Sequence, residues 1–391
     1  MVLASCFLRS PFYRPSRRES ARWMTAKGLS HAIQSGNNRP PLKKAISMEH
    51  SAFGQTADGQ KASLFRAGNE HLQVAFTDDG ARMVSIMSRD RHGAWDHVLL
   101  GHDSAEAYAA EGGSLGVVLG RYANRIAGGD LRIDGAHHRL ATNENGNTRH
   151  GGPDGFGKRL WEVVRHDAES ITFGLNSPDG DQGFPGEVYA EAEYRLAGDT
   201  LWLTLTAQTD KPTAINLSVH PYFNLGTSGT IHDHIIQIAA TQYLATDSAQ
   251  IPFSPPRFVA DTPFDCQQPV VLGAILLSNH PQLKIAGGLD HCFCLDGRVT
   301  ENPRNVAGLY HPDNGRLLRI MTTQAGLQVY TGNNLTGQFK GLNGLLHQRY
   351  AGIALEAQNY PDAPHHSSFP YSIVKPGELY RHQIGFQFTT G

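Results

Sequence analysis

The sequence is poor in cysteine and has almost no net charge. Only 4 of its 391 residues are cysteine, and Lys plus Arg (34) nearly balances Asp plus Glu (36). The three cysteines of the body, Cys266, Cys292 and Cys294, lack the spacing of a disulfide framework, which favours a reducing compartment. The charge balance argues against nucleic acid or an acidic membrane as the partner.

Long hydrophobic runs are also absent. The longest nearly apolar run, residues 269–277, is about half as long as a membrane-spanning helix and contains Pro and Gly. The overall hydrophobic content of 40% nevertheless suffices for a large core. These features predict a globular protein with no membrane partner, located in the cytoplasm.

The N-terminal region differs from the rest of the chain. Residues 1–47 carry nine basic side chains and one acidic side chain, so the remaining residues have a net charge of −10. The region has no sustained periodicity, which predicts a disordered extension. Its Arg-rich composition also suits an organelle transit peptide, and Met24 or Met48 could be the true start.

From about Ala52 onward, apolar and polar residues alternate with period two, broken by turn residues every eight to twelve positions. This pattern predicts an all-β fold, a large antiparallel β-sandwich with very little helix, as a single domain over residues 48–391. Predicted hairpins join 187–196 to 201–207, 72–76 to 83–87, and 160–165 to 170–175. Only 103–111 has good helix composition.

Several segments interrupt this alternation with polar residues, and a site should be sought there. Asn124 and Arg125 lie between glycines, and His150 lies in a Gly-rich loop. Asn216, Ser218 and His220 share one face of a predicted strand, which suggests a wet pocket more than a core. Each feature taken alone also has an ordinary structural explanation, such as a surface turn.

Three further segments add polar groups to apolar strands. Asp290 and His291 begin one strand, Gln328 shares a face with Tyr330, and Glu356 follows Leu355 in another. A carboxylate in an apolar strand is costly unless it is paired or used, so Glu356 is the best candidate for a raised pKa. With no phosphate-binding motif, this set of imidazoles, carboxylates and amides suits a neutral polyol.

These blocks together resemble the aldose 1-epimerase (galactose mutarotase) family. The matching segments include G-R-Y-A-N-R-I, H-G-G-P-D-G-F, N-L-S-V-H-P-Y-F-N-L, L-D-H-C-F, Q-V-Y-T-G-N and L-E-A-Q-N-Y-P-D-A. The resemblance covers nearly all of the chain from residue 50 onward. It implies a large β-sandwich that interconverts the α and β anomers of free aldoses without a cofactor or metal, as a monomer or homodimer.

The resemblance also implies roles for individual residues. Glu356 matches the general base that deprotonates the anomeric hydroxyl, His220 the general acid at the ring oxygen, and His150 a second imidazole near that oxygen. Four further positions match sugar-binding residues of the family: Asn124, Arg125, Asp290 and Gln328. A carboxylate near His220 is expected to keep its pKa from falling far below neutral. Arg149 departs from the family pattern, in which an apolar residue is usual, as does the H-H-S-S that follows Pro364.

Three alternatives stay open at this stage. A sugar-binding or regulatory module on the same fold would need no catalysis. A glycoside hydrolase or lyase would rely on the carboxylates of Glu356 and Asp290. A cupin-like metal enzyme would use His150, His220, His291 and Glu356, although their spacing does not resemble its motif. Cys292 and Cys294 are interpreted as buried thiols rather than metal ligands.

Overall fold

The computed structural model describes residues 48–391 except 227, 228, 297 and 343, so the predicted disorder of residues 1–47 lies outside it. The described residues belong to one compact unit. The hairpin predicted from the strictest alternation is β13 (Val188–Ala197) paired antiparallel with β14 (Thr200–Thr209). Alternate side chains of β13 are buried, because successive residues of a strand point to opposite faces.

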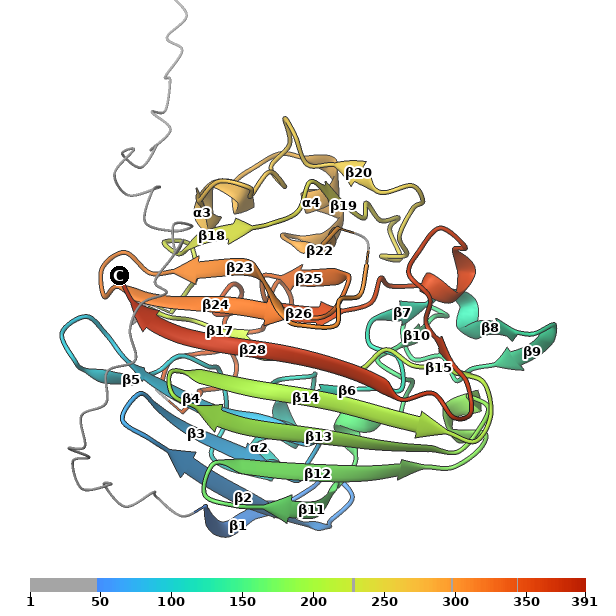
Figure 1. Ribbon diagram of the computed structural model, residues 1–391. Coiled ribbons are helices and arrows are strands. Elements are labelled where there is room, and N and C mark those ends of the chain that lie inside the picture. Colours follow the sequence, from blue (N-terminus) through green and yellow to red (C-terminus); the bar gives the residue numbers. More distant parts are fainter. Residues whose placement is uncertain (1–47, 227–228, 297, 343) are drawn as a thin grey trace, which may run out of the picture. The chain divides into compact units, whose positions relative to one another are not determined.

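These two strands belong to the largest sheet, whose strands are all antiparallel to their neighbours (Figure 1). In spatial order, the nine strands are β11 (Glu162–His166), β12 (Ser170–Ser177), β13, β14, β28 (Tyr380–Thr390), β24 (Arg316–Thr322), β23 (Arg304–Tyr310), β18 (Ile235–Ile238) and β21 (Val270–Val271). The C-terminal strand β28 therefore lies in the middle of this sheet and joins its two halves.

Two smaller antiparallel sheets accompany it. One contains β1 (Glu49–Gln55), β2 (Lys61–Gly68), β3 (Leu72–Thr77), β4 (Arg82–Arg89) and β5 (Trp95–His97). The other contains, in spatial order, β17 (Tyr222–Phe223), β26 (Ile353–Gln358), β25 (Gly326–Tyr330), β22 (Asp290–Cys294), β19 (Gln242–Tyr243) and β20 (Arg257–Phe258). Short pairs join β6 (Val118–Leu119) to β16 (Ser218–Val219), β7 (Arg125–Ile126) to β10 (Thr148–Arg149), β8 (Asp130–Ile133) to β9 (Ala136–Arg139), and β15 (Thr213–Ala214) to β27 (Ile373–Val374).

One continuous apolar core joins the three main sheets. Phe76 of β3 stacks on Tyr194 of β13 with ring centroids 4.4 Å apart, and Phe223 of β17 contacts Phe386 of β28 at 5.6 Å. The large sheet thus packs against both smaller sheets. This confirms the predicted all-β sandwich, and each fully buried aromatic ring stabilises it by about 1.5–3 kcal/mol.

Helices are few and short in the described residues. The predicted helix is α2 (Ala105–Glu111), capped by the Ser104 side chain and ended by Gly112. The other helices are α3 (Leu272–Leu276), α4 (Pro281–Ala286) and the 3-10 turns η1 (Ala127–Gly129), η2 (Phe156–Lys158), η3 (Asp181–Gly183) and η4 (Ala363–His365). Within the described part of the chain, no helix combines the length and apolarity that crossing a bilayer requires.

Candidate active site

One face of the six-stranded sheet carries the polar side chains that the sequence singled out. In β26, Leu355 and Ala357 belong to the main core, so Glu356 between them points to the opposite face. The strand register places Gln328 of β25 directly beside Glu356, and Tyr330 beside Asp290 of β22. Three adjacent strands thereby bring two carboxyl groups to the same face.

Gln328 shares this face and contacts one of the two carboxyl groups. Its side-chain amide donates a hydrogen bond of 2.6 Å to Asp290 Oδ1, and it is not among the residues that line the pocket. The structure thus gives Gln328 a contact that holds the Asp290 carboxylate in place. Its predicted direct contact with a sugar stays a prediction.

His220 faces Glu356 from the segment between β16 and β17. Its Nε2 lies 3.3 Å from Glu356 Oε1, and both side chains are 2% exposed. The imidazole stacks on the Tyr222 ring, with centroids 4.8 Å apart. His220 Nδ1 and Glu356 Oε2 are buried without a protein hydrogen-bond partner. Both atoms can therefore form a hydrogen bond with a ligand.

His150 approaches His220 from the Gly-rich loop, with ring centroids 5.6 Å apart. The backbone N–H of Asn124 donates to His150 Nδ1 at 3.1 Å, and the His150 N–H donates in return to the Asn124 carbonyl at 2.9 Å. Because Nδ1 accepts, the neutral ring carries its proton on Nε2. The backbone therefore makes the free nitrogen of His150 a hydrogen-bond donor.

Two guanidinium groups share one carboxylate at the pocket. Arg125 Nε lies 2.5 Å from Glu144 Oε2, and Arg149 Nη1 lies 3.2 Å from Glu144 Oε1. Arg125 also donates to Gln250 Oε1. The Arg125 side chain is 6% exposed and that of Arg149 is 36% exposed. Arg125 is thus fixed by charge-assisted hydrogen bonds, and Arg149 is held by an ion pair.

Burial disfavours the charged forms of the central groups. Burial, and then repulsion from Asp290, raise the pKa of Glu356 to about 8. Burial and the positive charge of Arg149 lower the pKa of His220 to about 3. The predicted neighbouring carboxylate is present, but the expected near-neutral pKa of His220 is wrong because burial outweighs the pairing. At pH 7 the pair therefore holds one proton.

Some polar residues that were expected at the site serve the fold instead. Asn216 donates to the Ala123 carbonyl and Ser218 Oγ to the Ala357 carbonyl, both fully buried. The expectation of a wet pocket along that strand is therefore wrong except at His220. His291 Nε2 contacts Gln282 at 3.2 Å, outside the pocket, so the cupin-like ligand set does not form.

Six of the seven predicted site residues line one polar pocket: Asn124, Arg125, His150, His220, Asp290 and Glu356. Sequence reasoning did not assign the five others that line it: Glu144, Arg149, Gln250, Tyr330 and Asn334. Glu144 and Arg149 lie in the Gly-rich loop, and Tyr330 shares a face of β25 with Gln328, so the sequence contains a weak indication for these three. It contains none for Gln250 and Asn334. A larger cavity of about 460 Å³ lies elsewhere, but its lining is mostly apolar.

Cys292 and Cys294 lie on β22 as buried free thiols, as predicted. Burial raises the pKa of Cys294 to about 11, so its sulfur stays protonated near neutral pH. The sulfur atoms are therefore core groups and supply no nucleophile to the pocket.

Comparison with known proteins agrees with this arrangement. The family model described as aldose 1-epimerase matches residues 63–387. The galactose mutarotase of Homo sapiens is 37% identical over 346 residues, covering 88% of this chain and 99% of its own. The aldose 1-epimerase of Escherichia coli is 35% identical over 337 residues, covering 85% and 96%.

Solved structures agree as well. The galactose 1-epimerase of Lactobacillus acidophilus superposes with a TM-score of 0.75 at 27% identity, covering 88% of this chain and 99% of its own. An aldose epimerase homologue from C. elegans gives a TM-score of 0.77 at 26% identity, with coverages of 84% and 99%. The family match, the sequence identity and the shared fold all extend over most of the chain. The chain therefore belongs to the aldose 1-epimerase family.

Proposed function

We propose that this protein is a mutarotase that interconverts the α and β anomers of free aldohexoses, with Glu356 and His220 as its acid–base pair. The observation that carries the proposal is the buried contact of 3.3 Å between these two groups. Galactose mutarotases and aldose 1-epimerases among its relatives act, by their names, on this class of sugar. The substrate is thus a free monosaccharide, and the enzyme is an isomerase.

The reaction requires two coupled proton transfers. Glu356 removes the proton of the anomeric hydroxyl while His220 protonates the ring oxygen, and the bond between C1 and that oxygen breaks to give the open-chain aldehyde. Rotation about the C1–C2 bond presents the other aldehyde face. The same transfers in reverse then close the ring as the opposite anomer and return both protons.

The electrostatics of the pocket favour the ring-opening step. Ring opening proceeds from the form of the pair in which a carboxylate lies beside an imidazolium, with the same single proton, and it leaves a neutral acid beside a neutral imidazole. Burial raises the pKa of Glu356 and lowers that of His220, so both changes favour the neutral pair. The pocket thus drives the proton from the sugar to Glu356 and from His220 to the ring oxygen.

The surrounding groups would orient the sugar. His150 donates through Nε2 and steadies charge that develops near the ring oxygen. Asn124, Arg125 and Asp290 present amide, guanidinium and carboxylate groups for the hydroxyls. Gln328 acts through Asp290, which it holds by the 2.6 Å hydrogen bond.

The polarimetric decay of freshly dissolved α-D-galactose and α-D-glucose tests the proposal directly. We expect the purified protein to accelerate both decays, with no loss of rate after chelator treatment. Methyl α-D-galactoside, which lacks a free anomeric hydroxyl, should bind competitively and keep its rotation. Binding of the sugars without acceleration would instead identify a sugar-binding module, and release of nitrophenol from an aryl galactoside a hydrolase.

The catalysed rate should fall as the pH rises through about 8. Above that pH the pair loses its single proton, because the pKa of Glu356 is raised to about 8, and His220 then has no proton to donate. The positive charge of Arg149 lowers the pKa of both partners. Arg149→Leu should therefore move this alkaline limb to higher pH.

The measurement is kcat/KM from pH 6 to pH 10, after subtraction of the spontaneous reaction. Arg195→Leu is a suitable control, because Arg195 is an exposed residue of β13 that is paired to Glu193. A rate that stays level to pH 10, or an equal shift of the limb in both variants, would contradict the proposed proton count.

A further inference from the structure

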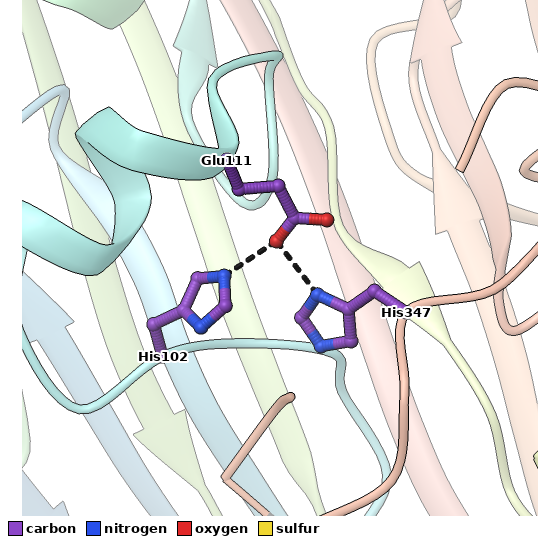
Figure 2. Close-up of side chains that lie close together, drawn as sticks. All are labelled: His102, Glu111 and His347. Atoms are coloured by element: carbon purple, nitrogen blue, oxygen red, sulfur yellow. Dashed lines mark hydrogen bonds and ion pairs between the residues drawn. The ribbon is translucent and has the colours of Figure 1, made fainter. Parts of the chain in front are cut away.

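Three side chains of the types that can ligate a metal ion converge away from the active-site pocket (Figure 2). His102 Nε2 lies 2.5 Å from Glu111 Oε2, and His347 Nδ1 lies 2.7 Å from the same oxygen. All three ligand atoms lie within 4.8 Å of one another. Figure 2 shows the two imidazole rings on the same side of the Glu111 carboxylate.

The cluster is buried and joins three separate segments. The side chains of His102, Glu111 and His347 are 4%, 7% and 0% exposed. His102 follows β5 in a loop, Glu111 is the last residue of α2, and His347 lies in the segment of residues 331–352 between β25 and β26. Glu111 and His347 are 236 residues apart in sequence, so the cluster cross-links distant parts of the chain.

We propose that His102, Glu111 and His347 bind a divalent transition-metal ion of the Zn²⁺ type, with a water molecule as the fourth ligand. Two imidazoles and one carboxylate are the donor set that such ions take, whereas Mg²⁺ and Ca²⁺ prefer oxygen ligands. The ion would fasten the loop of His347 to the end of α2. It would supply no step of the proposed acid–base reaction.

The described geometry requires a small adjustment to hold the ion. With metal–ligand distances of roughly 2.0–2.1 Å, tetrahedral ligands lie roughly 3.3 Å apart, so the two oxygen–nitrogen gaps must widen by about 0.6–0.8 Å. The end of α2 has room for this shift, because nothing lies within 4 Å of a Cβ built on Gly112 or Gly113. As the ion binds, the proton that now faces Glu111 on each imidazole would move to the other ring nitrogen, or leave for solvent where the ring is doubly protonated.

An entry route is also present. The cavity of about 460 Å³ over β2, β3 and β4 is lined by His102 and Asp103. One of the three ligands therefore borders a space wide enough for a hydrated ion. The ion can reach the cluster without passing through the pocket of Glu356 and His220.

A second cluster of similar composition serves as a matched control. Asp233 contacts His234 Nδ1 at 3.0 Å and His311 Nε2 at 3.2 Å, through different carboxylate oxygens. The backbone N–H of Leu225 donates to His234 Nε2, so both ring nitrogens of His234 are engaged. The Asp233 side chain is 42% exposed. Hydrogen bonding therefore accounts for this cluster without an ion.

The test uses the full chain without an affinity tag, stripped with chelator and then titrated with ZnCl₂. We expect one Zn²⁺ per chain by calorimetry and a rise in melting temperature of roughly 3–5 °C at 100 times the Kd. His347→Asn and Glu111→Gln should each weaken the site at least about tenfold to 100-fold. His311→Asn should leave Zn²⁺ binding unchanged, and MgCl₂ should have no effect.

The proposal would be overturned if the wild type did not bind Zn²⁺, or if His347→Asn bound it as tightly as the wild type. The cluster would then be a set of hydrogen bonds without an ion. If the variants fail to fold, Co²⁺ added to the stripped wild-type protein decides. A visible absorption band typical of four-coordinate Co²⁺, titrated away by one equivalent of Zn²⁺ per chain, supports the site. A six-coordinate spectrum, or no band, rejects it.

Discussion

Glu356→Gln is expected to lower kcat for mutarotation by about 10²–10⁴-fold. Gln preserves the size of the side chain but cannot take the proton from the anomeric hydroxyl. His220 would then lack the partner at 3.3 Å that completes the proton exchange. Polarimetry with α-D-galactose measures the loss, and calorimetric titration of the sugar measures whether binding survives. We expect KM and sugar affinity to change far less than kcat, because the substitution removes a group needed in the transition state.

The stability of the same variant gives an independent check. Glu356 has a folded pKa of about 8 against an ordinary value of 4.5. The buried carboxyl group therefore costs the wild type stability as the pH rises from about 4.5 to about 8, where the unfolded chain ionises first. Glu356→Gln should remove that part of the pH dependence and leave the protein at least as stable at pH 8.

Glu187→Gln is the matched control, because Glu187 is exposed on the surface. It should keep full activity and the wild-type dependence of melting temperature on pH. An active Glu356→Gln enzyme would refute the role of Glu356. An inactive Glu356→Gln protein with a collapsed melting temperature would show that the lost activity reflects folding instead.

His220→Asn is expected to cost a similar factor of about 10²–10⁴ in kcat, because the ring oxygen loses its proton donor. The double variant Glu356→Gln/His220→Asn should be hardly slower than either single variant. The two groups exchange protons as one unit, and either loss alone stops the exchange. Polarimetry on all four proteins provides the complete double-mutant cycle.

His166→Asn is the control for this substitution, because His166 is exposed on β11. Losses that multiply in the double variant would show that the two residues act independently. In that case the shared proton between Glu356 and His220 is not part of the mechanism.

The strands were predictable because they depend on local pattern. Buried and more exposed side chains alternate along β13 and β14. The β-strand is the regular backbone structure in which side chains repeat every two residues, so this pattern predicts a strand. The helix α2 was predictable for the same reason, since Ser104 and Gly112 mark its ends. The short helices α3 and α4 escaped prediction because five or six residues hold too little periodicity.

The candidate site was predictable only in part. The apolar strand around Glu356 correctly predicted its raised pKa. Alternation, however, predicted a pocket at Asn216 and Ser218, whose side chains instead bind backbone carbonyls. Period two tells which residues share a face, and it does not tell what covers that face. Gln328 has the predicted face, but its amide hydrogen-bonds to Asp290, a contact that depends on the register of β22 and β25.

By itself, the sequence determined the all-β class, the hairpins, the family and most of the pocket residues, because these depend on local spacing and on motifs that the chain carries intact. Only the tertiary structure decided the distances between the side chains that would carry out the reaction or bind an ion. It set the contact between His220 and Glu356, the tautomer of His150, and the convergence of His102, Glu111 and His347. Burial and the proximity of charges shift pKa values, and both arise only when segments far apart in the chain pack together.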